Sequence, residues 1–451
     1  MIHIVGGGLA GSEAAWQLAE RGHEVVVHEM RSVRKTPAHQ TDRLAELVCS
    51  NTFKSTELSN AHGLLKAEMR ALGSLILTCA DEARVPAGSA LGVDRDAFAV
   101  AVTERVTSHP RISVERGEIT ELPSPGIVAT GPLTSDALAE AISARIGAES
   151  LAFYDAIAPI VSRESLDDSI VYRASRYGKE TMQGADEEGA YLNCPVTREE
   201  YEALLDAMTA ADQYPGLEFD PVPYFEGCMP VEEMAKRGRE TLRFGPLKPV
   251  GLRDPRTGRE AYAVVQLRQE DRAGQMWNLV GFQTRMRTGD QQRVLRMIPG
   301  LANAEFLRFG SIHRNSYLNS PAALTPHLSL RDDPRVLFAG QITGVEGYTE
   351  SSATGLLAGI NLSRMLIGDE PVVPPATTML GALYRYMREA DPRHFQPMNA
   401  NFGLVDELDG RIRDKRRRRE AIAERALNAI ADWMQQHGIE SRAPVAHAGV
   451  A

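Results

Sequence analysis

Two of the four cysteines stand where a thiol could act as a nucleophile. Cys228 is followed by Met229-Pro230, and residues 231–238 then have the features of a short helix, with two glutamates in its first turn and a terminal glycine. The positive end of a helix dipole stabilises a nearby thiolate, which would make Cys228 reactive. Free cysteines are also commonly small buried side chains. The local pattern is equally compatible with both interpretations.

Cys49 lies in the segment 46–53, where an apolar stretch gives way to the capping residues Ser50 and Asn51. This context allows a reactive thiol but favours a buried one. Cys79 and Cys194 have no surroundings that suggest more than a structural role. The four cysteines form no Cys-x-x-Cys pair, so we predict no disulfide framework and no metal site, and we expect a reducing cytoplasm.

A glycine-rich turn near the N-terminus has the spacing of a dinucleotide-binding motif. Residues 2–5 are typical of a short buried strand, and Gly6-Gly7-Gly8-Leu9-Ala10-Gly11 follows directly. Residues 12–19 then predict a helix with small side chains, and residues 24–28 predict a second strand that ends at Glu29. Strand, turn, helix and terminal acid thus occur in the order that a nucleotide-binding unit requires.

Each of these residues has a mechanical reason to be there. Gly6 permits the tight turn, Gly8 lets the backbone approach a pyrophosphate, and Gly11 allows close packing of helix on strand. The start of the helix offers free N–H groups to the phosphates. Glu29 can accept hydrogen bonds from an adenosine ribose.

Two later segments favour FAD over NAD as the nucleotide. Residues 127–132 predict a buried strand that ends in an Ala-Thr-Gly turn. Residues 336–341 predict another strand, which leads through Thr343-Gly344 toward a helix over 351–363 with its N-terminus at the flavin. From these segments we expect four residues beside the cofactor: Gly131, Gly340, Gln341 and Gly344.

The nucleotide-binding segments are far apart in the sequence, so one domain must be assembled from separate pieces. We predict an α/β protein with a Rossmann-like FAD-binding domain of the glutathione-reductase type, formed by residues 1–164 and 326–451. Residues 165–325 are predicted to form an inserted α/β domain. After residue 375 the chain is expected to be helical, with Ala423, Leu427, Ile430 and Met434 on the packed face.

Composition excludes some classes of protein and leaves RNA binding open. The 451 residues are 43% hydrophobic and 24% charged, and no apolar run approaches the length of a membrane span. The net charge of −10 argues against a surface coated in positive charge, but RNA binding needs only a local basic stripe. Arg411, Arg413 and residues 415–419 form such a run, although a solvated helix face is the more common explanation of one.

In addition to the spacing of these motifs, the chain resembles the TrmFO family of folate- and FAD-dependent tRNA (uracil-5-)-methyltransferases over almost its whole length. The segments that carry this resemblance are 6–13, 36–39, 47–51, 86–88, 93–95, 191–195, 225–237, 244–251, 263–269, 280–284, 313–315, 340–347 and 399–403.

The resemblance implies a reaction that the cysteines make chemically sensible. A thiolate adds to C6 of uracil, and C5 then attacks the one-carbon unit of 5,10-methylenetetrahydrofolate. Reduced FAD, recharged by NADH or NADPH, would supply the two further electrons that a methyl group needs. By similarity Cys228 is the C6 nucleophile, and Cys49 is the second functional cysteine.

The implied substrate is the T-loop uridine at position 54 of tRNA, which would become ribothymidine. With the family in view, the basic run becomes a candidate for RNA contact, and we expect phosphate contacts from Arg285, Arg287, Arg416 and Arg418. No metal or membrane is implied, and a monomer or a homodimer is expected. The alternatives are the same chemistry on a ribosomal RNA uridine, an NAD(P)H–flavin oxidoreductase, or an RNA-binding protein that keeps FAD for stability.

Overall fold

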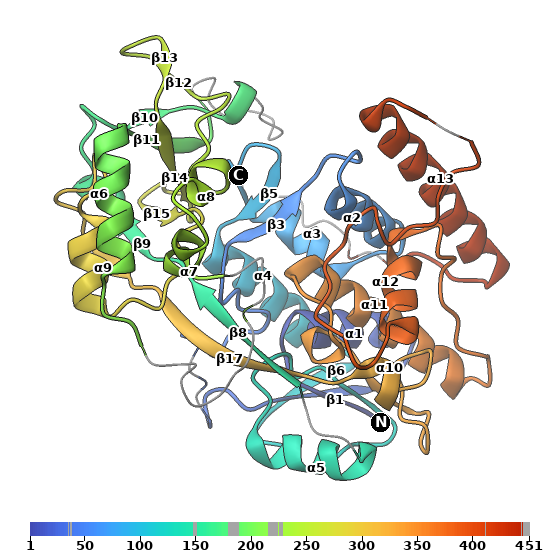
Figure 1. Cartoon of the computed structure of the whole chain (residues 1–451). Helices are drawn as coiled ribbons and strands as arrows, with labels where there is room; N and C mark the ends of the chain where they lie inside the picture. The colour runs from blue at the N-terminus through green and yellow to red at the C-terminus, as the bar shows by residue number, and fades with distance from the viewer. Residues whose placement is uncertain are drawn as a thin grey trace.

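The computed structural model (Figure 1) describes residues 1–34, 36, 38–147, 151–178, 189–214, 224, 229–410, 412–442 and 444. For residues 151–155, 313 and 314 it describes the backbone alone.

A five-stranded parallel sheet forms the base of the molecule, in the order β18-β7-β1-β2-β6. Its strands are rich in Val and Ile, as expected for strands that are covered on both faces. Both predicted N-terminal strands and the two later ones belong to this sheet, so the predicted α/β class is confirmed. Their bounds are β1 Ile2–Val5, β2 Val25–Glu29, β6 Ile112–Arg116, β7 Gly126–Val128 and β18 Val336–Phe338.

Two helices pack closely against each other beside this sheet. The predicted helices are α1 (Leu9–Ala19) and α11 (Tyr348–Leu366). A methyl group added to Gly355 would lie 2.2 Å from the carbonyl oxygen of Ala10, and one added to Gly359 would lie 2.9 Å from that of Ala14. The absence of side chains at these two positions of α11 lets the helix backbones approach, which fixes the start of α11 near the glycine turn.

Further elements complete the nucleotide-binding part and its C-terminal extension. The three-stranded sheet β3-β5-β4 and helices α2 to α4 lie between β2 and β6 in the sequence, and α5 follows β7. On α13, Ala423 and Ile430 are buried and Leu427 and Met434 pack against the core, as their spacing predicts. The bounds are β3 Thr52–Ser55, α2 Ala61–Ala71, α3 Leu75–Glu82, β4 Arg84–Val85, β5 Ala90–Val93, α4 Arg95–Ser108, α5 Asp136–Ile146, α10 Ser320–Ala323, α12 Met379–Glu389 and α13 Lys415–Gln436.

A second sheet of six strands, in the order β10-β11-β14-β15-β9-β16, has its own hydrophobic core. Figure 1 shows this part set apart from the parallel sheet, with the antiparallel ribbon β8–β17 running between the two. The domain boundaries at 165 and 325 stay a prediction. The bounds are β8 Leu151–Ile157, β9 Ile160–Ser162, β10 Tyr172–Arg173, β11 Tyr191–Val196, α6 Arg198–Thr209, α7 Val231–Lys236, α8 Thr241–Phe244, β12 Arg253–Asp254, β13 Arg259–Glu260, β14 Ala263–Gln269, β15 Met276–Leu279, α9 Thr288–Leu295, β16 Phe306–Arg308 and β17 Ser311–Tyr317.

Within the residues that the structure describes, no helix is both long enough and apolar enough to cross a membrane.

Candidate functional site

A cavity of about 330 Å³ lies at the carboxyl ends of the parallel strands. Its wall includes a residue at or just after the end of every strand of the sheet: Val5, Glu29, Gly117, Ala129 and Gly340. Open α/β sheets bind their ligands at this edge, where loops and helix N-termini converge. The predicted nucleotide residues Gly6, Gly8, Glu29, Gly131, Gly340 and Gln341 all line it.

The glycine turn packs closely at Gly6 and Gly11 and is open at Gly8. Gly6 has a φ of +103°, and a methyl group there would lie 2.5 Å from the carbonyl oxygen of Ala129. A methyl group on Gly11 would lie 1.8 Å from the carbonyl oxygen of Gly6, so this glycine permits close approach of α1 to β1. Gly8 lines the cavity with no neighbouring atom within 4 Å of such a group. The backbone at Gly8 is therefore open to a ligand.

Glu29 is held as a buried carboxylate at the end of β2. Its Oε2 accepts hydrogen bonds from the N–H of Gly7 at 3.0 Å and from Nη2 of Arg31 at 2.8 Å, and its Oε1 accepts from the N–H of Arg31 at 2.9 Å. Burial works against ionisation, yet these bonds and the charge of Arg31 lower the pKa of Glu29 below its ordinary value. A charged carboxylate at this position suits a ribose diol, and that role of Glu29 stays a prediction.

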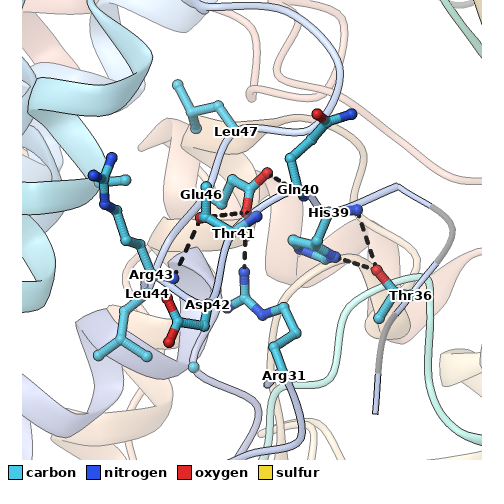
Figure 2. Close-up of polar contacts among 12 residues, drawn as sticks. Arg31, Thr36, His39, Gln40, Thr41, Asp42, Arg43, Leu44, Glu46 and Leu47 are labelled. Atoms are coloured by element: carbon cyan, nitrogen blue, oxygen red, sulfur yellow. Dashed lines mark hydrogen bonds and ion pairs between the residues drawn. The ribbon is translucent and has the colours of Figure 1, made fainter. Parts of the chain in front are cut away.

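Arg31 joins Glu29 to a loop that the local motif did not predict, and Figure 2 shows its contact with Glu46 of that loop. Its Nη1 lies 3.6 Å from Oε2 of Glu46, which also accepts the N–H of Thr41 at 2.9 Å. Glu46 accepts the N–H of Gln40 at 2.8 Å through its other oxygen. This loop brings Thr36, Ala38 and His39 to the cavity wall. Only the family resemblance of residues 36–39 pointed to them.

The N-terminus of α11 also faces the cavity, as predicted for the helix that approaches the flavin. Gly347, Tyr348 and Ser351 line the wall there. Glu350, in the first turn, is 1% exposed, and its Oε1 lies 3.0 Å from Nδ1 of His62. Burial works against its ionisation, but Lys54 and His62 lower the pKa of Glu350 to about 2. The last predicted residue, Gly344, lies behind the wall with a φ of +86° and packs on Phe395.

Cys49 lies in the same cavity wall, next to the nucleotide-binding residues. Its N–H donates to the Tyr348 hydroxyl at 2.8 Å. The local sequence favoured a buried thiol, and that expectation is wrong, because contacts distant in sequence hold this loop at the cavity and leave Cys49 partly exposed. Cys79 and Cys194 are fully buried, and burial raises the pKa of both thiols, that of Cys79 to about 12.

Cys228 lies outside the described residues, but the helix that follows it is described. Helix α7 begins at Val231, with Pro230 as its N-cap. The N–H of Val231 donates to the carbonyl oxygen of Gln283 at 2.7 Å, and Gln283 lines the cavity. Glu232 accepts hydrogen bonds from the Thr284 hydroxyl at 2.9 Å and from the N–H of Arg285 at 2.7 Å. The second part of the molecule therefore presents the start of α7 beside the cavity.

The four arginines predicted to contact RNA fall into two groups that the fold does not bring together. Arg285 is largely buried and forms an ion pair with Glu233 at 2.6 Å, whereas Arg287 is exposed and lies over the ring of Tyr214. Arg416 and Arg418 are exposed on α13, where Arg416 pairs with Glu420 at 2.9 Å. Figure 1 shows α7 and α13 on opposite sides of the molecule. Arg411, from the same basic run, lies outside the described residues.

No cluster of three or more His, Cys, Asp or Glu side chains that could hold a metal ion occurs in the described part of the chain.

Comparisons with known proteins show the family and support the fold. A family model described as "Glucose inhibited division protein A" matches residues 1–370. A protein of Geobacter sulfurreducens named methylenetetrahydrofolate–tRNA-(uracil-5-)-methyltransferase TrmFO is 58% identical over 96% of this chain and 98% of its own length. A protein of the same name from Bacillus subtilis is 52% identical over 95% of this chain and 97% of its own.

Among solved structures, Aquifex aeolicus GidA in its form I crystal superposes with a TM-score of 0.70 at 15% identity. The match covers 98% of this chain and 76% of that one, and it supports the fold alone.

Proposed function

This chain belongs to the TrmFO family of methylenetetrahydrofolate–tRNA-(uracil-5-)-methyltransferases, and on that premise we propose that it forms 5-methyluridine at position 54 in the T loop of tRNA. The observation that carries the proposal is the cavity itself. The residues that line it include the dinucleotide-binding turn, Glu29 and Cys49, and the helix that follows Cys228 begins beside it.

The residues of the cavity fit FAD. Gly8 leaves space for a pyrophosphate at the start of α1, Glu29 offers a carboxylate to the ribose, and Gly131, Gly340 and Gln341 line the wall toward the start of α11. Gly11 and Gly344 shape the backbone behind this wall. When bound, FAD reduced by NADH or NADPH supplies the two electrons that convert the methylene unit of the folate into a methyl group.

We assign both cysteines to the reaction at C5 and C6 of the uracil ring. The Cys228 thiolate adds to C6, which makes C5 nucleophilic toward the methylene carbon of 5,10-methylenetetrahydrofolate. The C5 proton is then removed, and tetrahydrofolate leaves as the bond between its nitrogen and the methylene carbon breaks. Once that carbon has been reduced to a methyl group, elimination of Cys228 from C6 restores the C5=C6 double bond. Cys49, at the cavity wall beside Tyr348, assists as the base or by positioning the ring.

The test uses the FAD-loaded protein, an unmodified tRNA transcript, NADPH or NADH, and 5,10-methylenetetrahydrofolate labelled in its methylene carbon. We expect labelled 5-methyluridine in the T loop, dependent on every small molecule, and at least a thousandfold less product from Cys228→Ala. Label that appears only in ribosomal RNA would replace the tRNA substrate. Fast NAD(P)H oxidation with no label in either RNA would favour a flavin oxidoreductase.

A further inference from the structure

The loop that carries Cys49 is held by two arginines that come from different parts of the molecule. Arg95, at the first turn of α4, donates from Nη1 to the carbonyl oxygen of Leu47 at 2.6 Å and from Nη2 to that of Cys49 at 2.8 Å. Arg308, at the end of β16 in the second sheet, donates from Nη2 to the carbonyl oxygen of Val48 at 3.0 Å. Three consecutive carbonyl groups are thus bound by guanidinium groups.

A buried acid of the second sheet anchors this arrangement. Nε of Arg95 donates to Oε2 of Glu270 at 2.5 Å, and the Glu270 side chain is 1% exposed. Glu270 directly follows β14, so the second sheet contacts the Cys49 loop twice, through Arg308 itself and through Glu270 by way of Arg95. On the other side of the loop, the N–H of Cys49 donates to the Tyr348 hydroxyl.

Two guanidinium groups brought close together in a partly buried place cost electrostatic energy. Burial, and after it the charge of Arg95, lower the pKa of Arg308 below its ordinary value. The carbonyl oxygens of the loop and the Glu270 carboxylate are the acceptors that offset this cost.

We infer that Arg95 and Arg308 are positioning residues that fix the Cys49 thiol in the cavity, and that Arg308 makes this position depend on the second sheet. The inference rests on the proposed function, in which Cys49 acts on the uracil ring. Glu270 and Arg308 lie in the same part of the molecule as α7, so the part that holds the Cys49 loop also presents the helix that follows Cys228. A thiol displaced by even an ångström loses much of its reactivity toward a bound ring.

The decisive variant is Arg308→Met, which removes the charge and the donor but keeps the length of the side chain. Arg296→Met is the matched control, because Arg296 also donates to a carbonyl oxygen, that of Ala304, which lies outside the Cys49 loop. Arg308→Lys restores the positive charge and a hydrogen-bond donor group, and tests whether these recover the activity. All three are compared as FAD-loaded proteins with unchanged flavin absorbance.

Two measurements separate positioning from simple stability or RNA binding. For Arg308→Met we expect kcat about tenfold lower with KM for tRNA within twofold, substantial recovery in Arg308→Lys, and native values in Arg296→Met. Without RNA, we expect iodoacetamide to alkylate Cys49 several-fold more slowly in Arg308→Met, as measured on the peptide that contains it.

Unchanged kcat and unchanged alkylation of Cys49 in Arg308→Met would overturn the inference, and so would a raised KM alone, which would make Arg308 a phosphate contact. If Arg308→Met does not fold, Glu270→Gln tests the same positioning of the Cys49 loop through Arg95. We expect the same decreases in kcat and in the rate of Cys49 alkylation. Full methylation by Cys49→Ser would remove Cys49 from the proposed function. The alkylation of Cys49 in Arg308→Met would still show whether Arg308 positions the thiol.

Discussion

Gly8 and Gly11 stand three residues apart in one turn, yet a methyl group added to each would meet opposite surroundings. On Gly11 it would lie 1.8 Å from the carbonyl oxygen of Gly6, and on Gly8 it would project into open space at the cavity. The two positions therefore separate the packing of the turn from its contact with a ligand.

We predict that Gly11→Ala lowers the free energy of unfolding of the apoprotein by roughly 2–3 kcal/mol, because α1 must move away from β1. Gly8→Ala should leave that free energy within about 1 kcal/mol of native and weaken FAD binding by at least about tenfold. Chemical denaturation and titration of flavin fluorescence measure the two quantities. A Gly8→Ala protein that binds FAD normally would remove this glycine from the proposed cofactor contact.

The residues that sequence predicts well are those whose role is decided locally. Gly6, Gly8 and Glu29 belong to one strand–turn–helix–strand unit, so their spacing alone places them at the end of the sheet. The exposure of Cys49 could not be predicted in this way. It depends on Arg95, Tyr348 and other partners that are distant in sequence.

At the scale of elements, hydrophobic spacing predicts most of the helices and strands that form the site. The expected helix over 351–363 is α11, which begins three residues earlier, at Tyr348. This difference matters, because the added turn brings Tyr348 and the buried Glu350 to the cavity end of the helix. The strand β8 and its partner β17 were not predicted, since pairing between segments about 160 residues apart leaves no local signal.

Helix α13 combines an apolar face on the core with a basic N-terminal turn. Ile422, Ala426 and Trp433 are buried, whereas residues 415–418 are exposed. The packed face holds the helix on the body, so charge can be changed at its start without loss of the fold. The element is therefore suited to a test of the predicted RNA contact.

We predict that Arg416→Glu with Arg418→Glu weakens tRNA binding by roughly tenfold or more at low salt and much less at high salt, because fewer counterions are released. Filter binding over a series of salt concentrations gives the affinity and its slope. The control pair Arg145→Glu and Arg335→Glu makes the same change of charge at two exposed arginines of the parallel-sheet part, one on α5 and one just before β18. Equal effects of the two pairs would show a nonspecific response to net charge and leave the α13 run as a solvated face.

At the scale of the whole molecule, a buried amide next to the Cys49 loop joins the three-stranded sheet to the second sheet. Nδ2 of Asn51 donates to the carbonyl oxygens of Val93 and Gln269, at 2.9 and 2.8 Å, and its Oδ1 accepts from Nε of Arg268 at 2.7 Å. Asn51 and Gln269 are more than 200 residues apart, so no sequence pattern predicts their contact. Asn193, equally buried, makes comparable bonds within the second sheet alone, to Tyr172, Ala174 and Gln266 among others.

These two asparagines can be compared to test whether Asn51 holds the Cys49 loop and β5 against the second sheet. We predict that Asn51→Ala speeds amide hydrogen exchange by roughly ten- to a hundredfold in β5 and in the Cys49 loop, because buried partners lose bonds of about 1–3 kcal/mol. Exchange in β10 and β11 should stay native in that variant. Asn193→Ala should show the reverse, with faster exchange in β10 and β11 and native protection of β5. If Asn51→Ala leaves β5 and the loop protected, the second sheet does not hold the Cys49 loop through this amide, and the contacts of Arg95 and Arg308 hold it instead.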